Sequence, residues 1–190
     1  MPELIEVRFH GRGGQGAKTA ADLLAITALE SGKYIQAFPE YGPERAGAPI
    51  RAFTRISDEP INIHCGVTNP EVVVVIDPTL LEAVNVTEGL GDDGVLLANT
   101  EDGPEAIRKK INFKGGKVFT VDATKIALDT LGLAIPNTPM LGALIKATGL
   151  VSLDDLKEKV KKKFLKKIGE EKTKGNIDAL QKAYDEVKEG

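Results

Sequence analysis

The sequence predicts an α/β fold: a three-layer α/β/α Rossmann-like open sheet, mostly parallel and open to antiparallel edge strands, with a helical C-terminal layer. Three observations carry this prediction. A strand pattern leads through a glycine cluster into an Ala- and Leu-rich helix pattern within residues 4–29. The β-branched run 72–76 is typical of a strand buried on both faces of a parallel sheet. Strand and helix patterns then alternate up to residue 131, and only helix patterns follow.

The first elements are three strands and one helix. Residues 4–9 alternate apolar and charged side chains, as a half-buried strand does, and residues 17–29 have apolar side chains at helical spacing. Strands at 33–38 and 50–56 follow, separated by residues 39–49, which are too rich in Gly and Pro to be regular. This long loop is a candidate functional surface.

The middle of the chain repeats a strand and helix pattern. Beyond the central strand at 72–76, we expect strands at 95–98 and 118–121, each preceded by a turn that contains Gly. Helices are expected around 105–110 and 125–131. This alternation extends the predicted parallel sheet.

The end of the chain is predicted to be helical. Thr138 is the expected N-cap of one helix, with Pro139 at its first position, and Ser152 is the expected N-cap of the next, with Asp155 completing a capping-box pattern. A last helix is expected to begin near Asn176. Because no internal repeat is present, and one core can accommodate these helices, we expect a single domain over residues 1–190.

Composition excludes several functions. The 190 residues carry a net charge of −3, so there is no overall basic field, and we expect no nucleic-acid partner. Leucine, valine, phenylalanine and isoleucine recur every four residues between 156 and 168, which places the lysines of this stretch on a solvated helix face. Cys65 is the only cysteine, so this chain cannot ligate an iron-sulfur cluster with its own cysteines. No apolar run approaches the roughly 20 residues of a membrane span, so we expect a cytoplasmic protein.

The glycine cluster at residues 11–16 matches G-x-G-x-x-G and lies between a strand and a helix. Glycines there permit close backbone approach to a phosphate, and the helix N-terminus presents free N–H groups to an anion. An NAD site also needs an acidic residue after the second strand, and the nearest, Glu40, comes late. A nucleotide-triphosphatase loop needs Lys directly after the last Gly, but Ala17 precedes Lys18. Anion contact remains open, as does the alternative that the glycines only let the first helix pack closely.

Several polar residues allow both a ligand-binding and a structural interpretation. Asp77 and Asp122 follow strands and either orient a ligand or cap the next helix. Arg51 and Arg55 share one face of their strand and, with Arg45 in the loop, either bind phosphate or pair with a partner's carboxylates.

Four further residues are weaker candidates for metal binding or nucleophilic catalysis. The Asp pair in the stretch 91–94 is interpreted as a polar turn, because the sequence precedes a strand. His64 and Cys65 are interpreted as packing or surface residues, because no partner lies at a metal-ligand or nucleophile–base spacing.

Three ordered segments resemble the gamma subunits of 2-oxoacid:ferredoxin oxidoreductases. They are His10-Gly11-Arg12-Gly13-Gly14-Gln15-Gly16, the segment Phe38-Pro39-Glu40-Tyr41-Gly42-Pro43-Glu44-Arg45, and Asn137-Thr138-Pro139-Met140-Leu141-Gly142-Ala143-Leu144. The segment 176–187 is similar to the family's closing helix, so the resemblance covers essentially the whole chain. The stretch Ala46-Gly47-Ala48-Pro49 resembles the pyruvate branch of the family.

The resemblance implies a subunit of a pyruvate:ferredoxin oxidoreductase that is not catalytic alone. In such a complex, pyruvate, coenzyme A and oxidised ferredoxin give acetyl-CoA, CO2 and reduced ferredoxin, reversibly. The implied partners are an alpha and a beta subunit, which together hold thiamine diphosphate and magnesium, a delta subunit with iron-sulfur clusters, and ferredoxin through the complex. A stand-alone NAD-binding oxidoreductase, a gamma subunit for another 2-oxoacid and a purely structural interaction protein are the alternatives.

For this chain we expect scaffold and coenzyme A contacts rather than redox groups or a metal. Phosphates are expected at the glycine and arginine loops, and adenine is expected to stack on Tyr41 or Phe38. The candidate cofactor-binding residues are Gly11, Arg12, Gly13, Gly14, Gln15, Gly16, Tyr41 and Arg45.

Overall fold

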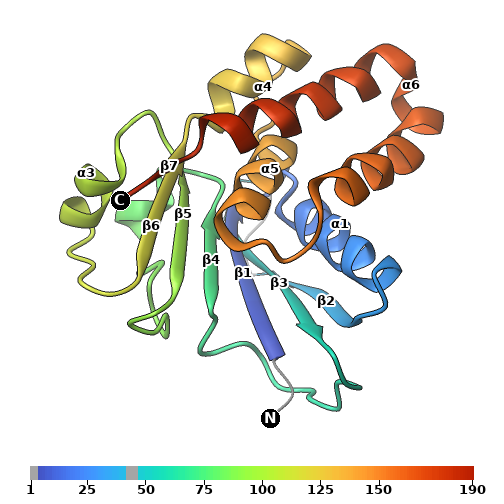
Figure 1. The fold of residues 1–190 in the computed structure, drawn as a ribbon. Helices are drawn as coiled ribbons and strands as arrows, with labels where there is room; N and C mark the ends of the chain where they lie inside the picture. Colours follow the sequence, from blue (N-terminus) through green and yellow to red (C-terminus); the bar gives the residue numbers. More distant parts are fainter. Residues whose placement is uncertain (1–3, 42–46) are drawn as a thin grey trace.

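The structure, a computed structural model, describes residues 4–41 and 47–190, with the side chain of Tyr41 left out. Within these residues, seven strands form one sheet in the order β2-β3-β1-β4-β5-β6-β7 (Figure 1). The strands are β1 (Leu4–Arg12), β2 (Tyr34–Tyr41), β3 (Pro49–Ser57), β4 (Val72–Val75), β5 (Val95–Asn99), β6 (Lys117–Val121) and β7 (Lys188–Glu189). The helices are α1 (Ala17–Glu30), α2 (Leu80–Ala83), α3 (Pro104–Lys110), α4 (Ala123–Leu131), α5 (Asn137–Thr148) and α6 (Leu153–Glu186).

The middle of the sheet is parallel and its edges are antiparallel. Strands β1, β4, β5 and β6 pair in parallel, whereas β3 pairs antiparallel with both β1 and β2, and β7 pairs antiparallel with β6. The four residues of β4 are all buried, as expected for a strand covered on both faces. The predicted α/β class is therefore confirmed.

Helices cover the two faces of the sheet unequally. On one face, α1 packs on β1, β2 and β3, while α5 and α6 complete the larger apolar core. On the other face, the shorter helices α2 and α3 cover only β4, β5 and β6, through residues such as Leu80 and Ile107. The β1–β3–β2 half of that second face is crossed by irregular segments at 61–69 and 84–90 instead of a helix. On this face, that half of the sheet is therefore covered by loops that hydrogen-bond to it and not by a helix.

Two predicted helix starts are wrong. Helix α5 begins one residue before Thr138, with Pro136 at the N-cap, and Met140 N–H already donates to the Pro136 carbonyl. Pro139 is tolerated there because N–H groups in the first turn need no intrahelical acceptor. The last helix does not start near Asn176, because α6 breaks at Gly169 (φ 81°, ψ 173°) and resumes directly after it, giving the two arms seen in Figure 1.

Other predicted features are confirmed. Ser152 caps α6, since its Oγ accepts a hydrogen bond of 3.0 Å from Asp155 N–H. In the first arm of α6 the predicted apolar face is confirmed only at its start, where Leu156 and Val160 are buried and most of the following lysines are exposed. Ile168 is instead 40% exposed, and Lys159 is buried, where it pairs with Glu30. None of the helices in the described part of the chain combines the length and the apolar character that a bilayer span demands.

Candidate functional site

The loop-covered face of β1, β3 and β2 carries three rows of polar and aromatic side chains. Alternate residues of β1 and β3 point to this face, and β2 continues each row through its register with β3. The rows, read from β2 to β1, are Gln36–Arg55–Glu6, then Phe38–Phe53–Arg8, then Glu40–Arg51–His10. The third row lies nearest the glycine loop at residues 11–16, which begins in the last two residues of β1.

Arg55 in the first row is buried and fully engaged. Its side chain is 2% exposed, and its Nε donates to Glu6 Oε1 at 2.6 Å. Its Nη1 donates to Gln36 Oε1 at 3.1 Å and its Nη2 to the Cys65 carbonyl at 2.9 Å. This arginine holds segment 61–69 on the sheet, so its role is structural.

Arg8 in the second row is equally buried but lacks a counter-ion. It is 2% exposed, and its Nη2 donates to the carbonyls of Val86 (3.0 Å) and Glu88 (2.6 Å). Its Nε has no hydrogen-bond partner, and no carboxylate of the described residues lies within ion-pairing distance of its guanidinium. Burial, with the like charge of Arg51, lowers the pKa of Arg8 below its ordinary value. The charges of Glu88 and Glu40 oppose this shift, but neither carboxylate forms an ion pair with Arg8.

The third row places an uncharged imidazole beside an accessible ion pair. His10 is 5% exposed and its Nε2 has no partner in the described residues. Burial, together with the charges of Arg8 and Arg51, lowers the pKa of His10 to about 3, so the imidazole is uncharged at neutral pH. Arg51 is more accessible and its Nη2 lies 2.9 Å from Glu40 Oε1.

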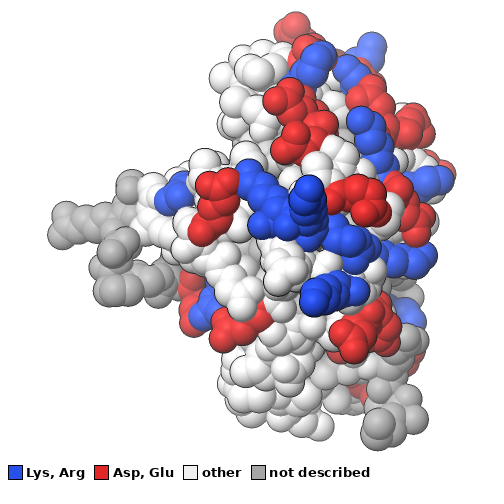
Figure 2. Space-filling view, turned by 90° about the vertical axis from the view of Figure 1, so that its left-hand side faces the viewer, with Lys and Arg blue, Asp and Glu red and all other residues white. Residues whose placement is uncertain are grey.

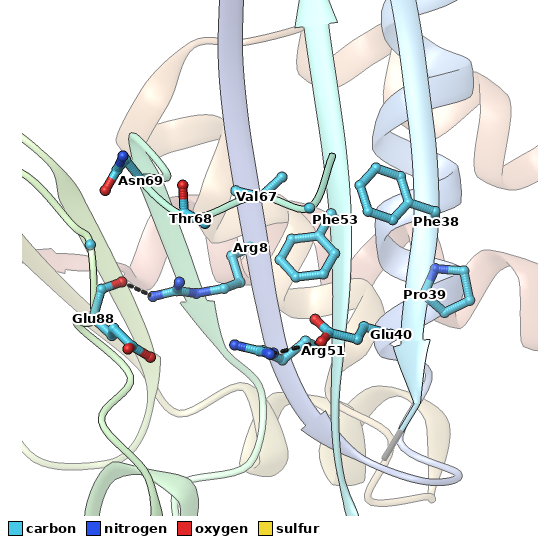
Figure 3. Close-up of a pocket in the computed structure, with 12 residues that line it drawn as sticks. Arg8, Phe38, Pro39, Glu40, Arg51, Phe53, Val67, Thr68, Asn69 and Glu88 are labelled. Carbon is cyan, nitrogen blue, oxygen red and sulfur yellow. Dashed lines mark hydrogen bonds and ion pairs between the residues drawn. The ribbon is translucent and has the colours of Figure 1, made fainter. Parts of the chain in front are cut away.

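A cavity of about 620 Å³ lies over these rows (Figure 3). Phe38 and Pro39 line it on the β2 side, Arg8 and Arg51 on the floor, and Thr68 and Asn69 where segment 61–69 crosses the strands. A second cavity of about 250 Å³ shares Glu40, Arg51 and Glu88 with the first and reaches His10 and the start of β3. Together we call these two cavities the groove. Its size is that of small-molecule sites.

The glycine loop at 11–16 lies beyond the His10 end of the groove, and its side chains are used internally. Gln15 Oε1 accepts from Arg12 N–H at 2.8 Å, and Gln15 Nε2 donates to Asp77 Oδ2 at 2.5 Å. Arg12 Nη2 donates to Thr79 Oγ1 at 2.9 Å. Burial opposes the ionised form of Asp77, but hydrogen bonds from Thr79 and Gln15 and the charge of Arg12 outweigh it and lower the pKa. Asp77 therefore anchors this loop.

Gly16 joins the glycine loop to α5. It has φ 80°, and an added Cβ would lie 2.4 Å from Asn137 Nδ2, which itself donates to the Gly16 carbonyl at 3.4 Å. The left-handed backbone and this close approach both require glycine. The first and third of the sequence segments singled out above therefore meet in space at the start of α1.

The candidate cofactor-binding residues differ in how the structure uses them. Among the glycines, Gly13 and Gly14 are exposed and Gly11 is buried. The side chains of Arg12 and Gln15 form hydrogen bonds that hold the loop together. The side chain of Tyr41 and all of Arg45 lie outside the described residues. The sequence analysis did not include Arg8 and His10 among the candidates. The available signal was their even spacing with Glu6, which places all three side chains on one face of the strand that pairs with β3.

The Asp, His and Cys residues considered above have structural or surface positions. Asp122 caps α4 by accepting from Lys125 N–H at 2.9 Å, and the Asp pair at 92–93 lies in a turn closed by Gly94 N–H to the Gly91 carbonyl. His64 and Cys65 are exposed. In the described ranges, no group of three His, Cys, Asp or Glu side chains could hold a metal ion.

The opposite end of the sheet has a different surface. On the side where α3 and β7 lie, Lys and Arg gather across the middle with Asp and Glu around them (Figure 2). Lys110 pairs with Glu82 at 2.8 Å and Lys117 with Glu189 at 2.9 Å. Mixed, paired and exposed charges of this kind make a solvated surface rather than an anion site.

Comparison with known proteins identifies the family. The model of the pyruvate ferredoxin/flavodoxin oxidoreductase family matches residues 6–186. The chain is 55% identical over 184 residues to pyruvate synthase subunit PorC of Thermotoga maritima, covering 97% of this chain and 95% of that one. It is 53% identical over 179 residues to the pyruvate/ketoisovalerate oxidoreductases common subunit gamma of Thermococcus kodakarensis, covering 94% and 97% of the two chains.

Two solved structures share the fold. The crystal structure of pyruvate oxidoreductase subunit PORC from Thermotoga maritima aligns with a TM-score of 0.89 at 51% identity, covering 99% of both chains. The 2-oxoglutarate:ferredoxin oxidoreductase of Magnetococcus marinus, solved with 2-oxoglutarate, coenzyme A and succinyl-CoA bound, aligns with a TM-score of 0.79 at 21% identity. That alignment covers 96% of this chain and 31% of the longer one. At this identity the second match shows the fold alone.

Proposed function

This chain belongs to the pyruvate ferredoxin/flavodoxin oxidoreductase family as a gamma subunit, and from this membership we propose that it binds coenzyme A in the groove over β1, β3 and β2. The subunit is part of a pyruvate synthase, a multi-subunit oxidoreductase. Its single cysteine does not fit an iron-sulfur cluster, which needs several cysteine ligands. Substrate binding is the contribution that its own side chains can make.

The observation that carries this proposal is the composition of the groove. Coenzyme A combines an adenine ring with phosphoryl groups of high negative charge. The groove places the half-buried ring of Phe38 on one side and the guanidinium groups of Arg8 and Arg51 on its floor. Aromatic contact for the base and charge-assisted hydrogen bonds for the phosphates are the interactions that such a ligand needs. The bound coenzyme A in the Magnetococcus marinus enzyme, whose fold is similar, gives the proposal further support.

The topology weakens the rival NAD interpretation. In a dinucleotide site, the acidic residue ends the strand that lies beside the first strand. Here β3 separates β2 from β1, and Glu40 on β2 pairs with Arg51 instead. The glycine loop and the acidic residue are thus one strand too far apart for the usual arrangement.

The coenzyme A proposal is tested on the intact complex with two variants. Arg51→Ala and Phe38→Ala remove one cation and one ring from the groove, and each is expected to raise the KM for coenzyme A by about 5-fold or more while the KM for pyruvate stays unchanged. Lys117→Ala, an exposed cation on β6 at the other end of the sheet, is the matched control. An unchanged KM for coenzyme A in both groove variants would reject the proposal.

We propose further that the partners are alpha, beta and delta subunits, with thiamine diphosphate and magnesium on the first two and iron-sulfur clusters on the third. Mild anaerobic purification of the chain from its native cells should recover all three subunits, together with pyruvate- and coenzyme A-dependent reduction of a viologen dye. A colourless chain recovered alone would contradict this composition.

The 2-oxoacid specificity is proposed to reside outside this subunit. The Thermococcus kodakarensis relative is named as common to the pyruvate and ketoisovalerate enzymes, so in that protein one gamma subunit serves two substrates. The stretch 46–49, which resembles the pyruvate branch, is therefore a weak basis for choosing the substrate. Exchanging gamma subunits between a pyruvate and a ketoisovalerate enzyme should leave the preference for the 2-oxoacid unchanged.

A further inference from the structure

Two buried side chains in the groove have unused hydrogen-bonding capacity, and their position is informative. Arg8 and His10 are 2% and 5% exposed, and Arg8 Nε and His10 Nε2 are the buried side-chain atoms without a partner among the described residues. Native proteins satisfy nearly all such atoms, so each one needs an explanation. Both residues also line the groove, Arg8 in the larger cavity and His10 in the smaller.

The cost of leaving Arg8 in this state is high. A buried guanidinium without a counter-ion forfeits its hydration and receives no ion-pair energy in return. Arg55, which is equally buried on the same face, is neutralised by Glu6. The fold can therefore supply a carboxylate to a buried arginine in this sheet, yet Arg8 receives only the backbone carbonyls of Val86 and Glu88. The charges of Glu88 and Glu40 act on Arg8 only from beyond ion-pairing distance, so its Nε remains free to donate to an added anion.

We propose that Arg8 and His10 form the subsite for a phosphoryl group of coenzyme A within the groove, an assignment that rests on the proposed function. Residues two apart on a strand share a face and lie about 7 Å apart, so one group can be reached from both side chains. Arg8 supplies a charged N–H and His10 supplies a neutral one from Nε2. Arg51, opposite His10 on β3, borders the same space.

The donors favour a phosphoryl group over a single carboxylate. A carboxylate is satisfied by one bidentate guanidinium, whereas a phosphoryl dianion offers three oxygens to donors from different directions. Arg8, His10 and Arg51 approach from two strands. Two carboxylates also face the groove: Glu40 is held by Arg51, and Glu88 forms no ion pair within the described residues. The ligand must compete with Glu40 for Arg51, whereas at Arg8 the charges of Glu88 and Glu40 act only from beyond ion-pairing distance.

The phosphoryl group can be either the 3′-phosphate or the diphosphate of coenzyme A. The two possibilities are distinguished by comparing two substrates. Assays on the intact complex compare coenzyme A with dephospho-coenzyme A, which lacks the 3′-phosphate. Arg8→Gln is expected to raise the KM for coenzyme A on the order of 10-fold or more, because a charge-assisted hydrogen bond is lost. If the diphosphate is bound, the KM for dephospho-coenzyme A rises equally; if the 3′-phosphate is bound, it does not rise.

A second variant covers the risk that Arg8→Gln disturbs folding. The His10 side chain forms no hydrogen bond to any described residue, so His10→Ala should assemble normally, and it is expected to raise the KM for coenzyme A about 3- to 10-fold with kcat unchanged. Unchanged KM values in assembled Arg8→Gln and His10→Ala complexes overturn the subsite. Failure of assembly with Arg8→Gln, combined with a normal KM in His10→Ala, also overturns it.

Failure of the subsite is distinguishable from failure of the proposed function. If Phe38→Ala raises the KM for coenzyme A but the Arg8 and His10 variants do not, coenzyme A lies in the groove and its phosphates bind elsewhere. If none of the groove variants changes that KM, both proposals fail together.

Discussion

Arg55 and Glu6 face each other on β3 and β1, and Arg55 Nε lies 2.6 Å from Glu6 Oε1 in a nearly dry environment. Two residues along β1, Arg8 is just as buried and has no such partner among the described residues. The contrast separates an arginine that stabilises the fold from one that we propose binds a ligand. Substituting Arg55 should therefore lower stability, whereas substituting Arg8 should weaken ligand binding.

Arg55→Met should destabilise the purified chain strongly, because it leaves the Glu6 carboxylate without its partner. We expect a loss of about 3 kcal/mol in the free energy of unfolding, measured by urea denaturation. Arg51→Met breaks an ion pair that is exposed on both sides and should cost less than about 1 kcal/mol. Equal losses for the two variants would show that the Arg55 pair is not a structural element.

His10 should make stability depend on pH in a defined window. Its pKa is about 3 in the folded chain and about 6.5 when unfolded, so between these values the unfolded state binds one more proton and stability falls as pH decreases. Between pH 7 and pH 5 the wild-type chain should lose about 2 kcal/mol more than His10→Asn, measured as the difference between urea unfolding curves. Identical losses would mean that the pKa of His10 does not differ between the folded and unfolded chains.

Gly16→Ala should be much more harmful than Gly14→Ala, although both glycines have positive φ. An added Cβ at Gly16 meets Asn137 at 2.4 Å, whereas at Gly14 it meets nothing within 4 Å. We expect costs of about 3 and about 1 kcal/mol respectively in thermal or urea unfolding. Adding Asn137→Ala to Gly16→Ala should recover part of the loss. No recovery would indicate that backbone strain alone makes glycine necessary at position 16.

Glu40→Gln should improve coenzyme A binding in the intact complex. The substitution removes a carboxylate from the groove and frees Arg51 Nη2 from its ion pair. We expect the KM for coenzyme A to fall about 2- to 5-fold at low ionic strength, and the difference to shrink as salt is added. Glu105→Gln, an exposed acidic residue on α3, is the control. A higher KM in Glu40→Gln would mean that Glu40 positions Arg51 for the ligand.

Local sequence patterns predicted most of the fold. The run 72–76 was enough to place a central strand, and Ser152 with Asp155 was enough to place the start of α6. The errors occurred where tertiary contacts decide. Pro136 replaces Thr138 as the cap of α5, whose start packs against Gly16. The last helical arm starts after the break at Gly169 and not near Asn176.

The candidate site was only partly predictable. The glycine loop was found from its spacing, but its side chains proved to be held by Asp77 and Thr79, which lie more than 60 residues away. Charged residues alternating on β1 predicted an exposed face. Arg8 and His10 are buried instead, because segments 61–69 and 84–90 cross that face, and irregular segments have no periodic signal that would reveal such a path.

The most direct test of the account is a structure of the intact complex with coenzyme A bound. The account predicts the adenine against Phe38 and a phosphoryl oxygen within hydrogen-bond distance of both Arg8 and His10 Nε2. Coenzyme A bound with no atom in the groove, or a partner subunit's carboxylate in contact with Arg8, would contradict it.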